Sequence, residues 1–218
     1  MSNDIKLVIF DLDGTLVDAY KAVASSINHT MAQMKEDSVD DETIKRSVGL
    51  GDRHLIGTFV KAQNVDRALS IFRQHHARAL KGGTTFLPGA RKLLDELKEK
   101  KYALAIASNR PARFSHIILK HLNIQNVFDC VLCGDQVARP KPAADILEQI
   151  LKKFSLETKE ALYVGDMAID VETGNKAGIK TIAVLTGSST KEEIDCLKPY
   201  KVIKNVYEVA QIVSNMTD

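Results

Sequence analysis

The sequence is poor in cysteine and has neither a long apolar run nor a clear excess of one charge. Three cysteines among 218 residues are an odd number, and no export signal precedes them, so we expect no disulfide framework. No segment approaches the roughly 20 consecutive apolar residues of a membrane span. The first residues also lack a basic segment followed by an apolar one. We therefore expect a cytoplasmic protein that does not insert into a membrane.

The charges are nearly balanced, because 30 Lys and Arg residues against 28 Asp and Glu residues give a formal net charge of +2. No basic run is longer than two or three residues, so the charge pattern is not that of a nucleic-acid-binding surface. We expect no nucleic-acid partner, and a ligand must be bound at a local site. The sequence predicts no oligomeric state.

The most informative segment is the apolar run of residues 7–10, which ends at two carboxylates. Four apolar residues in succession are typical of a strand buried on both faces, as in a parallel sheet covered by helices. Asp11 then lies at the carboxyl end of that strand, and Asp13 and Gly14 follow. Ligands of open α/β sheets bind at this edge, so the two carboxylates are candidates for a chemical site.

The rest of the chain predicts the architecture. Residues 19–83 have helical periodicity without a convincing strand, with helices expected near 41–47, 52–62 and 65–80. Strands and helices then alternate: strands at 102–107, 130–133, 161–164, 181–185 and 202–203, and helices at 90–100, 111–121, 143–154, 169–177, 191–197 and 206–213. This alternation predicts an α/β fold, a doubly wound parallel-sheet, Rossmann-like core. We expect the core at 1–16 and 84–218, and an all-helical cap at 17–83 inserted after the first strand.

Further polar residues follow the other predicted strands. Ser108 and Asn109 end the second strand, Lys141 follows the third, and Asp166 and Asp170 follow the fourth. Because the carboxyl ends of parallel strands meet at one edge of the sheet, we expect these side chains to converge on Asp11 and Asp13.

In these residues the sequence resembles the haloacid dehalogenase superfamily. The four motifs of that family occur in order, as Asp11-Leu12-Asp13-Gly14-Thr15, Ser108, Lys141, and Gly165-Asp166 with Asp170. Four features are similar to the phosphoglycolate phosphatase-like branch, which carries a helical cap. They are the helical insertion, the segment Ser108-Asn109-Arg110-Pro111, the turn 139–142 and the loop 186–188. The resemblance implies a magnesium-dependent phosphatase that acts on a small phosphorylated metabolite, with phosphoglycolate as a candidate.

The resemblance also implies a role for each motif residue. Asp11 is the nucleophile that forms an aspartyl-phosphate, Asp13 the general acid and base, and Lys141 the balancing cation. Mg²⁺ is bound by Asp11, by the backbone carbonyl of Asp13 and by Asp166, while Asp170 is an outer metal ligand or orients Lys141. Ser108 and the backbone N–H of Asn109 bind phosphate oxygens.

In similar proteins the cap loop that corresponds to residues 47–52 faces the core. Arg53 follows that loop, and its fork of donors would suit a carboxylate or a second phosphate on a small substrate, so we treat it as a candidate substrate-binding residue. The alternative is a solvated residue on the outer face of the cap.

Other functions can be compared with these residues. A dehalogenase would not need an acid at position 13, so Asp13 speaks against that activity. Phosphosugar mutases of the superfamily carry a His in the first cap helix, at the place of Val23 here. A pyrophosphatase remains an alternative, and a catalytically silent binding protein is disfavoured because no motif position is lost.

Some shorter motifs have simpler interpretations. We expect Cys130 and Cys133 to be buried, inert thiols on opposite faces of a strand. Residues 49–54 begin like a dinucleotide-binding motif but follow no strand, so a loop is expected. His75 and His76 are adjacent on a helix, so we expect diverging rings at the surface. Asp18 is expected to shape the entry to the cap.

Overall fold

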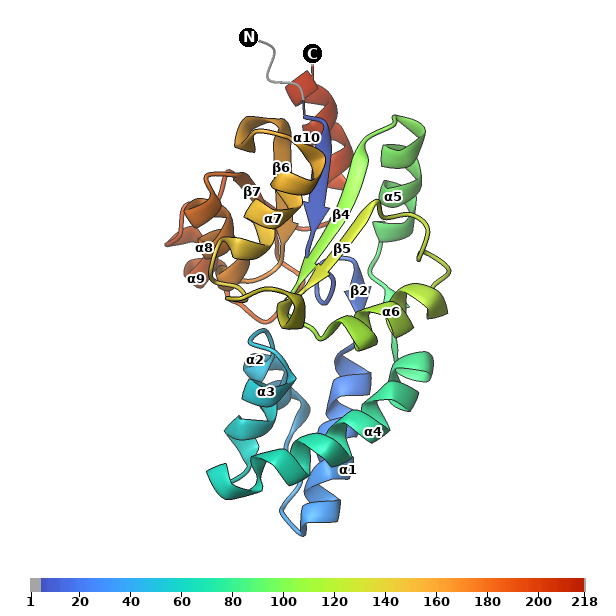
Figure 1. Cartoon of the computed structure of the whole chain (residues 1–218), viewed down its shortest axis with the longest axis vertical. Coiled ribbons are helices and arrows are strands. Elements are labelled where there is room, and N and C mark those ends of the chain that lie inside the picture. The colour runs from blue at the N-terminus through green and yellow to red at the C-terminus, as the bar shows by residue number, and fades with distance from the viewer. Residues whose placement is uncertain (1–4, 218) are drawn as a thin grey trace.

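The computed structural model describes residues 5–217 and has an α/β body with a group of helices at one end (Figure 1). The elements of the first half are β1 (Leu7–Phe10), β2 (Val17–Asp18), α1 (Tyr20–Met34), α2 (Asp41–Ser47), α3 (Asp52–Phe59), a 3₁₀ turn (Ala62–Asn64), α4 (Val65–Gly83), β3 (Thr85–Phe86) and α5 (Ala90–Glu99). Those of the second half are β4 (Ala103–Ser108), α6 (Ala112–His121), β5 (Cys130–Cys133), α7 (Asp145–Phe154), β6 (Ala161–Gly165), α8 (Ala168–Ala177), β7 (Lys180–Val184), α9 (Lys191–Asp195), β8 (Lys201–Ile203) and α10 (Glu208–Thr217), with 3₁₀ turns at Gly134–Gln136 and Thr158–Glu160.

Six parallel strands form the main sheet in the order β5-β4-β1-β6-β7-β8. The first strand of the chain is therefore central, and the order reverses on either side of it. Phe10 pairs with Ile106 of β4 and with Val164 of β6, so the three strands end at the same edge. Ligands bind at such a reversal point, and Asp11 lies there.

Helices cover both faces of the sheet, and the alternation of side chains along β1 shows why. Val8 and Phe10 pack in the core cluster that contains residues of α5, α6 and α10. Leu7 and Ile9 pack on the opposite face in the cluster that contains residues of α7. All four side chains are fully buried, which accounts for the continuous apolar run. The expected doubly wound parallel fold is confirmed.

The four helices α1–α4 form a separate layer with its own apolar cluster (Figure 1). Six side chains of α1 that recur at helical spacing are buried there: Ala22, Val23, Ser26, Ile27, Thr30 and Met31. Helix α2 begins after Asp40, whose side chain accepts a hydrogen bond from the Thr43 N–H.

A short ribbon joins the helical layer to the core. Val17 pairs with Phe86, and Asp18 pairs with Thr85, in an antiparallel two-stranded sheet at the point where the chain leaves the core and returns. This ribbon was not expected, because two-residue strands have no detectable alternation. Asp18 also accepts a hydrogen bond from the Tyr20 N–H at the start of α1. The helix expected at 52–62 ends earlier, at Phe59.

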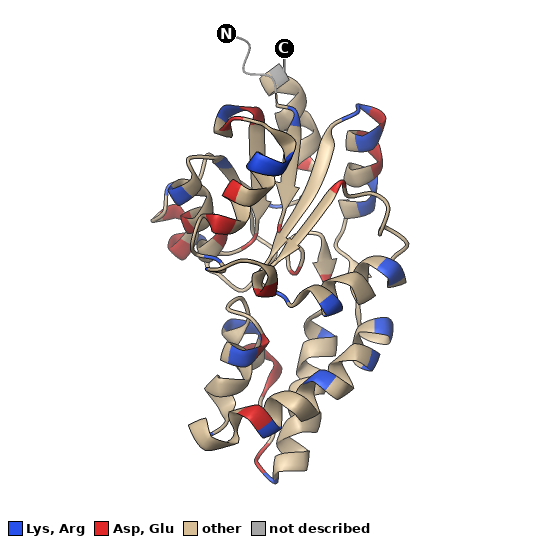
Figure 2. Cartoon of the chain, in the orientation of Figure 1, with Lys and Arg blue, Asp and Glu red and all other residues tan. Residues whose placement is uncertain are grey.

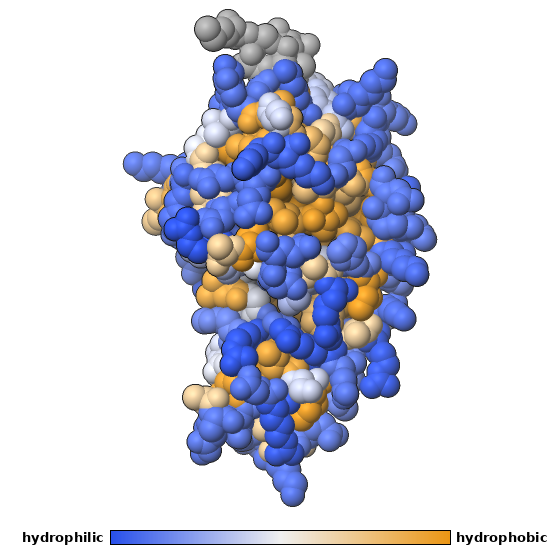
Figure 3. All heavy atoms as spheres, in the orientation of Figure 1, coloured by the Kyte–Doolittle hydropathy of each residue, from blue (hydrophilic) through white to orange (hydrophobic). Residues whose placement is uncertain are grey.

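Acidic and basic residues are interspersed over both layers (Figure 2). On the face in view, hydrophilic residues cover most of the surface, and hydrophobic residues gather over the edge strand β5 (Figure 3). Within the described residues, no helix combines the length and the hydropathy needed to cross a membrane. Cys130 and Cys133 are buried free thiols and Cys196 is exposed.

Candidate active site

The edge of the sheet brings together seven of the residues singled out in the sequence. Asp11 follows β1, Ser108 ends β4, Lys141 lies in the loop after β5, and Asp166 follows β6. A pocket between this edge and the helical layer is lined by Asp11, Asp13, Ser108, Asn109, Lys141 and Asp170 from the core and by Tyr20, Val23, Leu55, Phe72 and His76 from the helices. The expected convergence of scattered polar residues is present.

Lys141 lies at the centre of a buried network. Its Nζ is 2.6 Å from Asp11 Oδ1 and 2.7 Å from Asp170 Oδ1, and it also contacts the Tyr163 hydroxyl at 3.1 Å. The Tyr163 hydroxyl donates to Asp170 Oδ1 at 2.7 Å. Asp170 Oδ2 accepts from the N–H groups of Asp166 and Met167. Both oxygens of Asp170 are therefore occupied by protein donors.

Asp166 has a different environment. Its Oδ1 accepts a 2.7 Å hydrogen bond from the Thr15 hydroxyl, whereas its buried Oδ2 has no hydrogen-bond partner. Two glycines enclose that oxygen, since a Cβ at Gly14 or Gly187 would lie 2.2 or 1.8 Å from it. A buried carboxylate oxygen without a donor is costly unless a cation binds it.

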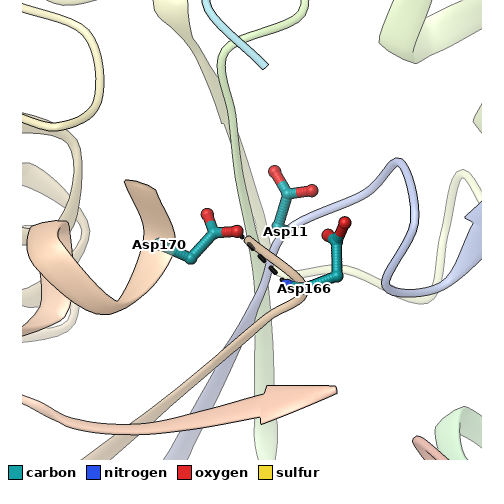
Figure 4. Close-up of side chains that lie close together, drawn as sticks. All are labelled: Asp11, Asp166 and Asp170. Atoms are coloured by element: carbon teal, nitrogen blue, oxygen red, sulfur yellow. Dashed lines mark hydrogen bonds between the residues drawn. The ribbon is translucent and has the colours of Figure 1, made fainter. Parts of the chain in front are cut away.

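The carboxylates of Asp11, Asp166 and Asp170 form one group, in which one ligand atom from each lies within 4.8 Å of the others (Figure 4). Burial raises the pKa of Asp11 to about 7, although the charge of Lys141 opposes this, and burial together with Asp11 raises the pKa of Asp166 well above its usual value. Burial also disfavours the charged form of Lys141, but Asp11 and Asp170 outweigh it and keep its pKa raised. Three buried carboxylates share one ammonium group, so this oxygen-rich site fits a divalent cation.

Asn109 links the core to the helical layer. Its side-chain Nδ2 donates to the carbonyl oxygens of Gly49 and Lys141, both at 2.9 Å, and its Oδ1 accepts from the Lys141 N–H. Gly49 lies against Met167, with a backbone φ of 120° that favours glycine. The loop between α2 and α3 therefore faces the core.

Asp13 is held by an arginine. The Arg110 guanidinium donates from Nε to Asp13 Oδ2 at 2.6 Å and from Nη2 to Oδ1 at 2.7 Å, so both carboxylate oxygens are bound. The third nitrogen, Nη1, lies 2.7 Å from Nε2 of His76 on α4. Because a guanidinium can only donate, Nε2 accepts and the ring proton is on Nδ1, which lies 3.0 Å from the Ser26 hydroxyl.

Two expectations about the helical layer are wrong. Arg53 does not line the pocket: its guanidinium pairs with Asp66 at 2.7 Å at the surface, where its side chain is 64% exposed. Leu55 faces the pocket, and successive residues are about 100° apart around a helix, so Arg53 points to the opposite side. His76 is not a surface residue, because it is 1% exposed and packs between Phe72 and Phe114.

The sequence reasoning did not assign roles to Arg110, His76, Tyr163 and Thr15. A signal existed for His76, since Phe72, His76 and Leu80 recur every four residues along the buried face of α4. No sequence signal was available for Tyr163, because an aromatic residue in a buried strand is normally part of the core.

Comparison with known proteins gives the family context. A model of the family described as haloacid dehalogenase-like hydrolase matches residues 8–184. A phosphoglycolate phosphatase of Aquifex aeolicus is 31% identical over 84% of this chain and 86% of its own length. A pyrophosphatase of Oceanobacillus iheyensis is 26% identical over 97% of this chain and 98% of its own. A structure described as a predicted phosphoglycolate phosphatase from Haemophilus somnus superposes with a TM-score of 0.90, at 23% identity, over 97% of this chain and 99% of the other, which shows a shared fold.

Proposed function

Because this chain belongs to the haloacid dehalogenase-like hydrolase family, as its motifs indicated, we propose that it is a magnesium-dependent phosphatase that hydrolyses a small phosphomonoester through an aspartyl-phosphate. The observation that carries the proposal is the pair formed by Asp11 and Lys141, 2.6 Å apart, beside the unpartnered Oδ2 of Asp166. A nucleophilic carboxylate, a fixed cation and an oxygen ligand for a metal are the groups that phosphoryl transfer needs.

In the proposed reaction an oxygen of Asp11 attacks phosphorus, an Asp11–phosphoryl bond forms, and the bond from phosphorus to the leaving oxygen breaks. Asp13 gives its proton to the leaving oxygen and takes one from the water that later hydrolyses the aspartyl-phosphate. The Ser108 hydroxyl and the N–H of Asn109 hold phosphate oxygens. Lys141 balances the negative charge of Asp11 and of the phosphoryl group.

Mg²⁺ would be held by the side chains of Asp11 and Asp166 and by the backbone carbonyl of Asp13, and it would supply charge neutralisation for the phosphoryl oxygens. Asp170 has both oxygens bound by Lys141, Tyr163 and two N–H groups. We therefore assign to it the orientation of Lys141 rather than direct metal binding.

We further propose that residues 17–83 act as a cap over the pocket and that the substrate is phosphoglycolate. The similarity to the phosphoglycolate phosphatase of Aquifex aeolicus supports this substrate. Pyrophosphate is the second candidate, because the similarity to a pyrophosphatase extends over 97% of this chain. A mutase is less favoured, because Val23, which lines the pocket, stands where those enzymes carry a His.

The test is phosphate release by the purified protein from phosphoglycolate, pyrophosphate, glucose 1-phosphate and an aryl phosphate, in Mg²⁺ and in excess chelator. We expect activity that requires Mg²⁺ and is highest on phosphoglycolate. The matched variant Asp11→Asn keeps the shape of the side chain but cannot form the acyl phosphate, so kcat should fall by more than about 100-fold, which corresponds to ~2.7 kcal/mol of barrier. Higher activity on pyrophosphate would favour the second candidate. Binding without turnover of any substrate would show a catalytically silent protein.

A further inference from the structure

Arg110 differs from Lys141, the other basic residue of the pocket, in the carboxylate that it binds. Among the described residues that line it, the side chains with a permanent positive charge are Lys141 and Arg110. Lys141 is bound to Asp11 and Asp170, inside the group that holds the phosphoryl chemistry. Arg110 and Asp13 both line the pocket, and the Arg110 side chain is only 10% exposed.

The contact between Arg110 and Asp13 conflicts with the proposed role of Asp13. A general acid must present a protonated oxygen to the leaving group. Here both oxygens accept hydrogen bonds from one guanidinium, at 2.6 and 2.7 Å, so neither oxygen faces a leaving group. In this arrangement Asp13 cannot act, and Arg110 has to release it before turnover.

A guanidinium fork that binds a carboxylate side chain can bind a carboxylate or phosphate of a ligand equally well, because the planar geometry is the same. We propose that Arg110 is the specificity-determining residue for a second anionic group on the substrate, and that this group takes the place of the Asp13 carboxylate on the guanidinium. The inference rests on the proposed function and deepens it. Recognition of the second anion and release of the acid are then one event.

Contacts from the helical layer hold Arg110 in place for this exchange. His76 accepts from Nη1 and so fixes the third nitrogen without competing for the two that face Asp13. The Ser26 hydroxyl on α1 lies 3.0 Å from the other ring nitrogen of His76 and donates to the Ala22 carbonyl oxygen at 2.7 Å. The fork is therefore oriented by the part of the chain proposed to be the cap.

The inference predicts selectivity for substrates with two anionic groups. Phosphoglycolate and 2-hydroxyethyl phosphate differ in one group: phosphoglycolate carries a carboxylate where 2-hydroxyethyl phosphate carries a neutral hydroxymethyl group. We expect Arg110→Gln to lower kcat/KM for phosphoglycolate by about 10- to 150-fold, the range for a lost charge-assisted hydrogen bond. The same variant should turn over 2-hydroxyethyl phosphate at least as fast as the wild type does. Arg110→Lys keeps the charge but not the fork, and should be intermediate.

Arg113→Gln is the matched control, since it removes the same charge from the same segment. The Arg113 side chain donates to the Arg73 carbonyl oxygen at the surface, and we expect neither substrate to be affected. A structural role for Arg110 would instead reduce turnover of both substrates together, and equal losses in Arg110→Gln would overturn the inference.

One measurement needs no variant. Acetate added to the wild-type protein should occupy the Arg110 fork and raise kcat/KM for methyl phosphate, which has no second anion of its own. No activation at any acetate concentration would contradict the exchange. If the wild type hydrolyses none of these phosphomonoesters, the proposed function itself fails. If it hydrolyses both matched substrates and Arg110→Gln leaves their ratio unchanged, only the present inference fails.

Discussion

His76 should make the stability of this protein sensitive to mild acid. Burial lowers the pKa of its ring to about 2, and the neighbouring charge of Arg110 acts in the same direction. His75 and Arg113 also oppose protonation. The geometry agrees with a neutral ring, because Nε2 accepts a hydrogen bond from Arg110 and the ring packs between two Phe side chains.

The sign and size follow from proton linkage. The unfolded chain takes up a proton on His76 near its ordinary pKa of about 6.5, whereas the folded protein does not. The stabilising contribution is therefore complete above that pH and is lost as the pH falls toward the folded-state pKa of about 2. Between pH 7.5 and pH 5.0 the loss is ~2 kcal/mol, at 1.36 kcal/mol per pH unit below the unfolded-state pKa. Any folded-state pKa below about 4 gives the same loss.

The assay is urea unfolding at pH 7.5 and at pH 5.0 for the wild type and for His76→Gln, whose amide hydrogen-bonds but does not titrate. The free energy of unfolding of the wild type should fall by ~2 kcal/mol more than that of the variant over this interval. His121→Gln, at an exposed residue at the end of α6, is the control for the removal of one imidazole. Equal losses in the wild type and in His76→Gln would refute a buried, neutral His76.

Two other predictions concern the proposed metal site and the proposed cap. Gly187→Ala would place a methyl group 1.8 Å from Asp166 Oδ2, so we expect the Mg²⁺ concentration for half-maximal activity to rise by roughly tenfold or more. Gly82→Ala, where the added Cβ meets no atom within 4 Å, should leave it unchanged. Arg53→Ala should not alter KM, because Arg53 does not line the pocket. It should not alter the urea midpoint either, because the exposed ion pair with Asp66 contributes little to stability. A raised KM for phosphoglycolate would show that Arg53 contacts the substrate.

The fold and the centre of the site could be predicted from the sequence because both follow from local patterns. A strand buried on both faces needs a continuous apolar run, as in residues 7–10, and the proposed nucleophile Asp11 follows directly after it. Parallel strands align their carboxyl ends, so Ser108, Lys141 and Asp166 could be expected near Asp11 although they are far apart in the chain.

The positions of Arg53 and His76 could not be predicted from the sequence, because they depend on how the helices pack. Helix phase decided that Arg53 points to solvent and that Leu55 faces the pocket, and one sequence does not define the phase of a short helix closely enough. His76 was expected at the surface because histidine is polar, but its position between Phe72 and Leu80 lies on the buried face of α4.

The sequence by itself determined the family, the parallel sheet and which carboxylates meet at its edge, because each of these follows from a contiguous motif or a periodic pattern. Only the tertiary structure decided the strand order, the unpartnered oxygen of Asp166 and the binding of Asp13 by Arg110. The physical reason is that the hydrogen bond from Arg110 to Asp13 spans 97 residues of sequence and depends on the pairing of β1 with β4, which brings together the segments that follow these two strands.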